Sequence, residues 1–303
     1  MRDLNLSSKV VRVLLPLFLI LLVPSGAAAE QAESPLVIGL IPELNVFEQR
    51  ERFSPLAELL TERVGRPVNL TMISRYGSVI ERLEQQQIDG AFLGSFTGLL
   101  ASLQLEMEPV ARPINVDGSS TYCGVLFVRE NTGIEDVEGM RGTRLALVDR
   151  ATTAGFLFPR AWIRSQGVEA MEGFFSEIQF WGSHDAALRA VTDGRADVGA
   201  AKNTVFDREL ERHPQWKEQI RVLARSEKVP SNGLFLAKRV DPAVRSRVRE
   251  VLLGLATDPE GKAVLQRLGF LGFVETDVED YAPVSELAAE AGIDSSTYSY
   301  GDP

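Results

Sequence analysis

The chain has 303 residues, of which 45% are apolar and 24% are charged, and its formal net charge is −10. This length suits two domains or one large domain, and the composition is that of a globular protein. The acidity argues against nucleic acid as a partner, because binding to a phosphate backbone requires a basic surface.

Residues 1–29 have the three parts of a secretory signal peptide. Arg2, Lys9 and Arg12 are basic, "VLLPLFLILLV" is a short apolar core, and three alanines precede Glu30. The alternative is a membrane anchor, but a proline interrupts the core and the core is short for a bilayer. We predict that residues 1–29 are cleaved, which leaves a periplasmic protein with a net charge of −12.

Strands and helices alternate after this segment. The apolar and amphipathic patterns predict strands at 35–42, 67–74 and 90–95, and helices at 54–65, 76–90 and 96–106. Ser54 is expected to cap the first of these helices, with Pro55 at its first position. The βαβαβ order predicts a parallel, doubly wound sheet.

A second α/β series follows, between two long extended runs at 120–131 and 233–240. If these runs pair as crossing strands, lobe 1 is discontinuous and spans about 35–125 plus 230–303, and lobe 2 spans 126–229. Asp89 and Asp197, in the similar phrases "QIDGAF" and "RADVGA", then occupy equivalent turns in two lobes of similar construction. The predicted fold class is α/β, with two doubly wound lobes joined by a two-strand hinge and a ligand cleft between them.

The phrase "RATTAG" follows a predicted strand and precedes a helix. Thr152 and Thr153, with the backbone of Ala154 and Gly155, could hold a tetrahedral oxyanion at the helix N-terminus. The alternative is that the threonines only cap the helix. From spacing alone, both interpretations remain open.

Two other side chains lie at predicted strand-to-helix junctions. His184 could donate to an anion, or it could cap its own helix or bond a neighbouring group. Tyr76 could reach a ligand from lobe 1, or it could be a partly buried aromatic whose hydroxyl contacts water. Both residues are candidate ligand contacts.

Ser95 and Asn203 complete the predicted ligand-binding set, and Lys202 could add positive charge to the cleft. Two histidines and one cysteine, without metal-ligand spacing, argue against a metal site. No nucleophile stands in a motif with a histidine and an acid, so we predict neither an enzyme nor a cofactor.

The chain resembles the periplasmic phosphate, phosphite and phosphonate binding proteins of ABC transporters, which have the type 2 periplasmic binding fold. Its similar phrases run along most of the sequence. The most specific are "GMRGTRLALVDRATTAGFLFPR" and "FWGSHDAALRAVTDGRADVGA"; others are "SRYGSVIERL", "IDGAFLG" and "TYCGVLFVRENTGI".

This resemblance implies that Thr152, Thr153 and His184 contact ligand oxygens and that Tyr76 closes over the ligand from lobe 1. It also implies a small oxyanion ligand and a membrane permease of an ABC importer as partner. Two departures stand out: Ala154 replaces a hydroxyl residue, and Gly98 lies near a position that is often aromatic, which predicts a more open cleft. No acid accompanies Lys202 at the later strand end, which argues against an aminophosphonate.

Three alternatives remain open at this point. One is a periplasmic sensor that signals to a two-component kinase without transport. Another is an exported enzyme on a similar fold, and the third is a binding protein for a different anion, such as a sulfonate or a carboxylate.

Overall fold

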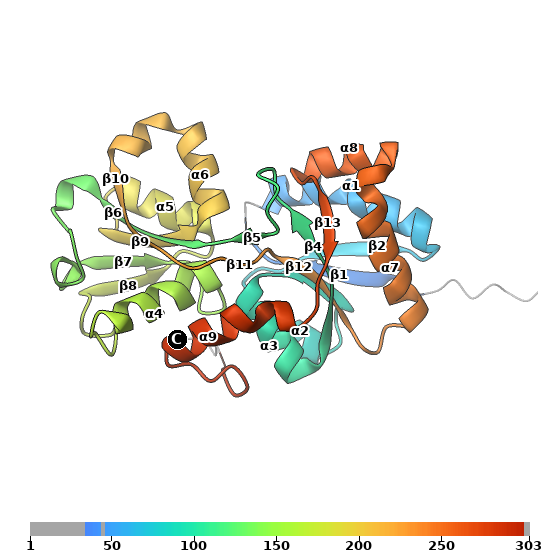
Figure 1. The fold of residues 1–303 in the computed structure, drawn as a ribbon, viewed down its shortest axis with the longest axis horizontal. Helices are drawn as coiled ribbons and strands as arrows, with labels where there is room; N and C mark the ends of the chain where they lie inside the picture. Colours follow the sequence, from blue (N-terminus) through green and yellow to red (C-terminus); the bar gives the residue numbers. More distant parts are fainter. Residues whose placement is uncertain (1–33, 44–45, 300–303) are drawn as a thin grey trace, which may run out of the picture. The chain divides into compact units, whose positions relative to one another are not determined.

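The first sheet of the computed structural model has six strands in the order β13-β4-β12-β3-β1-β2 (Figure 1). The structure describes residues 34–43 and 46–299, so the predicted signal peptide lies outside the described residues. β1 is parallel to β2 and β3, whereas β12 is antiparallel to β3 and β4. The strands are β1 (Leu36–Leu40), β2 (Val68–Met72), β3 (Gly90–Leu93), β4 (Met107–Ile114), β12 (Gly233–Ala237) and β13 (Gly272–Glu275).

The second sheet has five strands in the order β10-β6-β9-β7-β8. It repeats the plan of the first sheet, because β7 is parallel to β8 and β9 while β6 is antiparallel to β9 and β10. The strands are β6 (Gly124–Arg129), β7 (Arg144–Leu147), β8 (Glu177–Phe180), β9 (Val198–Lys202) and β10 (Ile220–Arg225). We refer to the elements around the first sheet as lobe 1 and to those around the second sheet as lobe 2.

Asp89 and Asp197 have equivalent hydrogen bonds in the two lobes. The Asp89 carboxylate accepts from the Val37 N–H at 2.8 Å, and the Asp197 carboxylate accepts from the Arg144 N–H at 3.0 Å. In lobe 1 the bond connects the turn before β3 to the start of β1, and in lobe 2 it connects the turn before β9 to the start of β7. This geometry agrees with the predicted similarity of the two lobes.

Two chain crossings connect the lobes, and they pair with each other. β5 (Thr121–Tyr122), which lies in the first predicted extended run, is antiparallel to β11 (Val229–Pro230) (Figure 1). The second predicted run, 233–240, does not take part in this pairing, because it forms β12 of the first sheet instead. The α/β fold class with a two-strand hinge is therefore confirmed. The residue limits of the lobes stay a prediction.

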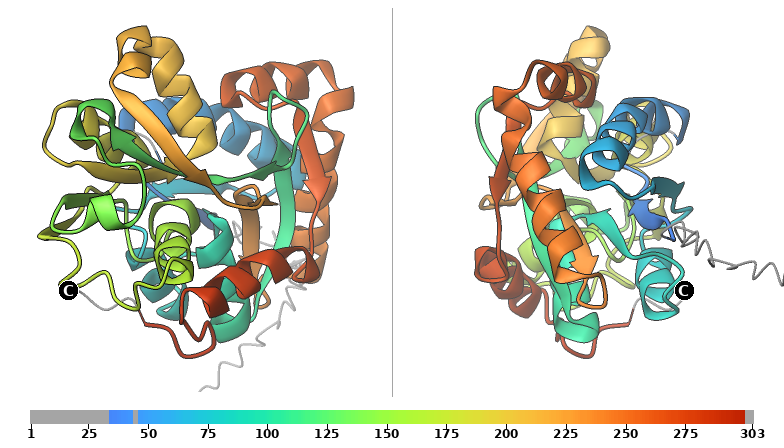
Figure 2. Two further views of the ribbon diagram at one scale, coloured as in Figure 1. Left: turned by 60° about the vertical axis from the view of Figure 1, so that its left-hand side comes forward. Right: turned by 90° about the vertical axis from the view of Figure 1, so that its right-hand side faces the viewer.

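Helices cover both faces of the first sheet (Figure 2). Apolar residues of α1, α7 and α8 form one core with β1, and those of α2 and α3 belong to another. Helix α9 contacts both α3 and α4, so the C-terminal segment touches both lobes. The helices are α1 (Val46–Val64), α2 (Ser78–Glu84), α3 (Ser95–Leu105), α4 (Phe158–Ser165), α5 (His184–Thr192), α6 (Asn203–Arg212), α7 (Pro242–Gly254), α8 (Pro259–Leu268) and α9 (Ala282–Glu290).

Two local predictions are wrong. Helix α1 begins at Val46, so Pro55 lies inside the helix and Ser54 donates to the Arg50 carbonyl instead of capping. Gly98 does not open the cleft, because a Cβ there would lie 2.4 Å from the Phe235 ring. The glycine permits close packing of α3 against β12.

Candidate functional site

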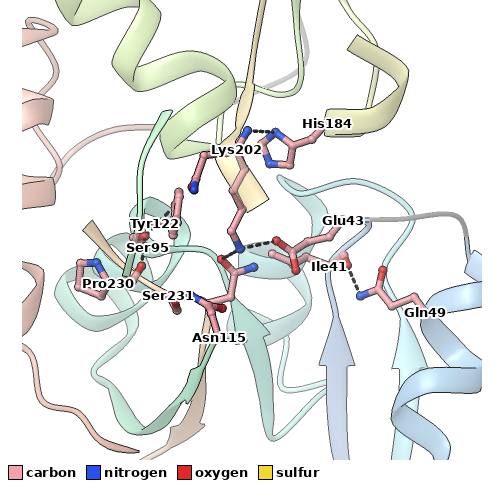
Figure 3. Close-up of polar contacts among 12 residues, drawn as sticks. Ile41, Glu43, Gln49, Ser95, Asn115, Tyr122, His184, Lys202, Pro230 and Ser231 are labelled. Atoms are coloured by element: carbon pink, nitrogen blue, oxygen red, sulfur yellow. Dashed lines mark hydrogen bonds and ion pairs between the residues drawn. The ribbon is translucent and has the colours of Figure 1, made fainter. Parts of the chain in front are cut away.

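Polar residues of both lobes follow the carboxyl ends of the parallel strands, where ligands of open α/β sheets bind. Figure 3 shows part of this region. Glu43 follows β1, Tyr76 follows β2, Ser95 follows β3, the Asp149–Thr153 loop follows β7, His184 follows β8, and Lys202 and Asn203 lie at the end of β9.

Tyr76 is only 2% exposed, and its hydroxyl has no hydrogen-bond partner among the described residues. Its ring meets the His184 ring edge-on, with 6.4 Å between centroids. Burial, followed by the charges of Glu43 and Asp149, raises the pKa of Tyr76 well above its usual value. The phenol is therefore a neutral donor that faces the imidazole of the other lobe without an acceptor of its own.

His184 begins α5, and its side chain is buried. Nδ1 accepts the Lys202 N–H at 3.1 Å, so the neutral ring carries its proton on Nε2. Burial lowers the pKa of His184 to about 4, and the Lys202 charge acts in the same direction. The ring is thus a neutral donor through Nε2, and the helix is capped by Ser183 rather than by His184.

The "RATTAG" loop enters a π-helical turn, Thr153–Leu157, which leads into α4. Thr152 Oγ1 donates to the Asp149 carbonyl at 2.6 Å and makes no capping bond to the helix. Thr153 Oγ1 accepts the Phe96 N–H at 2.9 Å, which leaves its own proton for another acceptor. The first helical amides, from Thr153 onward, have no acceptor within the helix.

The loop ends in Gly155 because there is no room for a side chain at this position. A Cβ at this position would lie 2.4 Å from Val148 Cγ2 and 2.8 Å from Thr152 Oγ1. The Gly155 carbonyl also accepts the Val148 N–H at 3.1 Å. Close backbone packing therefore fixes the loop, and Ala154 lies buried within it with only a methyl group.

Ser95 and Asn203 contact the crossing strands. Ser95 Oγ lies 2.8 Å from the Tyr122 hydroxyl and 2.7 Å from the Pro230 carbonyl oxygen (Figure 3). Asn203 Oδ1 accepts the Cys123 N–H at 2.9 Å. These bonds place both side chains at the hinge, and their role in ligand contact stays a prediction.

Sequence reasoning missed Glu43. Its carboxylate lies 2.9 Å from the Lys202 ammonium, which also lies 3.1 Å from Asn232 Oδ1 and 4.5 Å from the centre of the Tyr122 ring. Burial alone would raise the pKa of Glu43, but the charge and hydrogen bond of Lys202 outweigh it and lower that pKa. The sequence feature that could have identified Glu43 is its position directly after the predicted strand at 35–42, where ligand-binding side chains are expected.

A cavity of about 620 Å³ adjoins this region. Its lining includes Gly77, Asp149 and Gly182, which are close in sequence to Tyr76, Thr152 and His184 respectively. Arg75, Arg150 and Phe180 also line it. Because Glu81, Glu84 and Asp149 line it as well, the cavity presents charges of both signs and an aromatic surface to the space beside the candidate donors.

Within residues 34–43 and 46–299, no three His, Cys, Asp or Glu side chains are grouped as a metal site. No helix in the same ranges is long and apolar enough to cross a membrane.

Two α/β lobes joined by paired crossing strands, with polar loops at the strand ends, form the type 2 periplasmic binding fold. A solved structure of this fold is a binding protein component of an ABC phosphonate transporter from Pseudomonas aeruginosa. It superposes with a TM-score of 0.78 at 18% identity, over 86% of this chain and 87% of that chain.

Residues 38–281 match the family described as "ABC transporter, phosphonate, periplasmic substrate-binding protein", and the chain belongs to this family. The phosphonates-binding periplasmic protein of Escherichia coli is 22% identical over 87% of this chain and 79% of its own length. The phosphate-import protein PhnD of Mycolicibacterium smegmatis is 26% identical over 62% of this chain and 61% of its own length. The resemblance seen in the motifs is confirmed.

Proposed function

We propose that this protein captures a phosphate-like oxyanion (a phosphonate, phosphite or phosphate) between its lobes and delivers it to the membrane permease of an ABC importer. The observation that carries the proposal is the buried Tyr76 hydroxyl, which has no partner among the described residues and faces His184. A buried donor without an acceptor is costly, so its presence indicates a ligand acceptor.

The proposed contacts are mainly neutral donors. Tyr76 donates from lobe 1, while His184 Nε2, the Thr153 hydroxyl and the first amides of the π-helical turn donate from lobe 2. Thr152 and the Ala154 backbone support this loop. Preorganised neutral donors and a helix N-terminus hold an anion without a net positive field, which suits a chain of net charge −10.

Calorimetry on ligand-stripped protein tests the binding step. Phosphate, phosphite and methylphosphonate are titrated separately, with sulfate and acetate as anions of different chemistry. We expect heat with at least one phosphorus oxyanion and much weaker binding of acetate. Absence of heat with all phosphorus oxyanions, in protein shown to be folded, would overturn the proposal.

The alternative function is a periplasmic sensor that passes the bound state to a two-component kinase. Both functions share the binding step, so they differ only in the partner. Ligand uptake into vesicles that contain the reconstituted permease supports import, whereas ligand-dependent kinase activity without uptake supports sensing. The proposal that the protein acts as a carrier and not as an enzyme predicts unchanged ligand after long incubation.

The proposed periplasmic location depends on export and cleavage before Glu30. Mass spectrometry of protein recovered from the periplasm measures the mature N-terminus. A mature chain that begins at Glu30 supports the proposal, and retention of residues 1–29 contradicts it.

A further inference from the structure

Lys202 is a buried cation whose hydrogen-bonding capacity is filled by the protein. Its side chain extends from β9 in lobe 2 toward Glu43 of lobe 1 (Figure 3). The ammonium lies 2.9 Å from Glu43 Oε1, 3.1 Å from Asn232 Oδ1 and 4.5 Å from the Tyr122 ring centre. An ammonium has three N–H groups, so two oxygens and one aromatic face leave none of them for a ligand.

Glu43 lies close enough to the proposed oxyanion donors for its charge to act on them. That charge contributes to the raised pKa of Tyr76 and opposes the lowering of the His184 pKa by burial. A bare carboxylate at this position would repel an anion held between Tyr76 and His184, and it would attract a ligand that carries an ammonium group.

We propose that Lys202 serves as a tethered ammonium, which occupies the place on Glu43 that a cationic ligand group would otherwise take. The inference rests on the proposed function and narrows its substrate class. The site then selects phosphorus oxyanions whose substituent is absent or uncharged, and it rejects aminoalkyl phosphonates because Lys202 repels their ammonium group and already neutralises Glu43.

The Lys202–Glu43 pair also joins the two lobes, so removing it weakens closure for every ligand. For this reason the affinity for one ligand alone does not test the inference. The informative quantity is the ratio of two dissociation constants, for 2-aminoethylphosphonate and for propylphosphonate, which has a similar size and no ammonium.

Calorimetry measures this ratio in the wild type, Lys202→Met, and the double variant Lys202→Met with Glu43→Gln. We expect Lys202→Met to shift the ratio toward 2-aminoethylphosphonate by about tenfold or more, because Glu43 becomes available to the ligand ammonium. The double variant should lose this shift, because it lacks the carboxylate. Lys202→Gln is the substitute if Lys202→Met does not fold, with the same expectation.

An unchanged ratio in Lys202→Met, or a shift that persists in the double variant, overturns the inference while leaving the proposed function intact. A wild type that binds neither these phosphonates nor methylphosphonate, phosphite or phosphate overturns the proposed function itself. The two failures are therefore distinguishable in one set of titrations.

Discussion

In the proposed site, Tyr76 and His184 recognise an anion without carrying a formal charge. Burial keeps the phenol protonated, and the Lys202 N–H forces the imidazole proton onto Nε2. Both groups are then donors whose state does not change near neutral pH. The affinity of the site should accordingly depend on the ligand's own ionisation more than on that of the protein.

Replacing Tyr76 with phenylalanine removes a hydroxyl that has no protein partner. A hydrogen bond to a charged group contributes about 1.5–3 kcal/mol, so we expect oxyanion affinity to fall by about 10- to 100-fold. The free energy of unfolding of the ligand-free protein should stay the same or rise, because an unpaired buried polar atom is lost. Calorimetry and urea unfolding measure the two effects.

Tyr122→Phe is the matched control for this variant. The Tyr122 hydroxyl bonds Ser95 Oγ at 2.8 Å, so its loss should lower stability by about 1 kcal/mol. A Tyr76→Phe protein that is destabilised but binds normally would contradict the assignment of Tyr76 to the ligand.

The titration of His184 can be followed by proton NMR, because the chain has only two histidines. Its pKa of about 4 lies below its ordinary value of 6.5. Between these values the unfolded state binds more protons, so this group's contribution to stability falls as pH falls from about 6.5 to 4.

The variant His184→Asn identifies the resonance and removes this contribution. We expect its stability to depend less steeply on pH than that of the wild type over the same interval. A His184 resonance that titrates near 6.5 in the ligand-free protein would contradict the buried, neutral imidazole.

The sequence correctly placed Tyr76, His184 and the two threonines after strands, because the apolar patterns of those strands are clear; their contact with a ligand stays a prediction. It did not indicate the role of Glu43, because Glu43 and Lys202 meet only in the folded chain. Similarly, the hydroxyl of Ser95 looked available in the sequence, whereas the fold places the Tyr122 hydroxyl and the Pro230 carbonyl against it.

At the scale of elements, the π-helical turn Thr153–Leu157 sets the position of the candidate anion loop. Thr153 Oγ1 accepts from Phe96 at the start of α3, and Thr97 Oγ1 donates to the Ala151 carbonyl at 3.0 Å. The loop of lobe 2 is therefore tied to a helix N-terminus of lobe 1 through two hydrogen bonds. Its shape should be sensitive to any added volume.

Gly155→Ala places a methyl group where the nearest atom lies at 2.4 Å. We expect a loss of about 1–3 kcal/mol in the free energy of unfolding, together with weaker oxyanion binding, because Val148 and the loop must move apart. Gly254→Ala is the control, since a Cβ there meets nothing within 4 Å. Equal melting temperatures for the two variants would contradict the tight loop.

Most elements followed from apolar periodicity, and the exceptions have physical causes. The sequence did not predict β4, because Pro109 and Pro113 have no N–H to donate to a neighbouring strand. The structure accommodates Pro109 at an irregularity in the pairing of β4 with β12. Helix α1 was shortened in the prediction because Pro55 resembles a helix start. α9 is difficult to predict from the pattern, because only Val284 and Ala288 of its nine residues are buried.

At the scale of the whole molecule, contacts between lobes must break for a ligand to enter. The Lys202–Glu43 pair and the Phe96–Thr153 hydrogen bond both join lobe 1 to lobe 2. If the paired β5 and β11 strands act as a hinge, we expect the two lobes to open and close as these contacts break and form. Ligand binding and domain closure should then be observed together.

Small-angle X-ray scattering measures this closure. We expect the radius of gyration of the ligand-stripped protein to decrease when a bound oxyanion reaches saturation. At about 100 times the dissociation constant, the ligand should also stabilise the fold by about 2.7 kcal/mol. Tyr76→Phe at the same ligand concentration should show a smaller change in both, whereas a constant radius in the saturated wild type would contradict hinge closure.

The strand order of the first sheet has a consequence for the timing of biosynthesis. β12 lies between β3 and β4, yet β4 ends at Ile114 and β12 begins only at Gly233. The strands of lobe 2 are all contained in that interval, so lobe 2 can mature while the first sheet still has a gap at its centre. The first sheet of a nascent chain therefore stays incomplete until the segment from Gly233 onward has been made, even where lobe 2 has already folded.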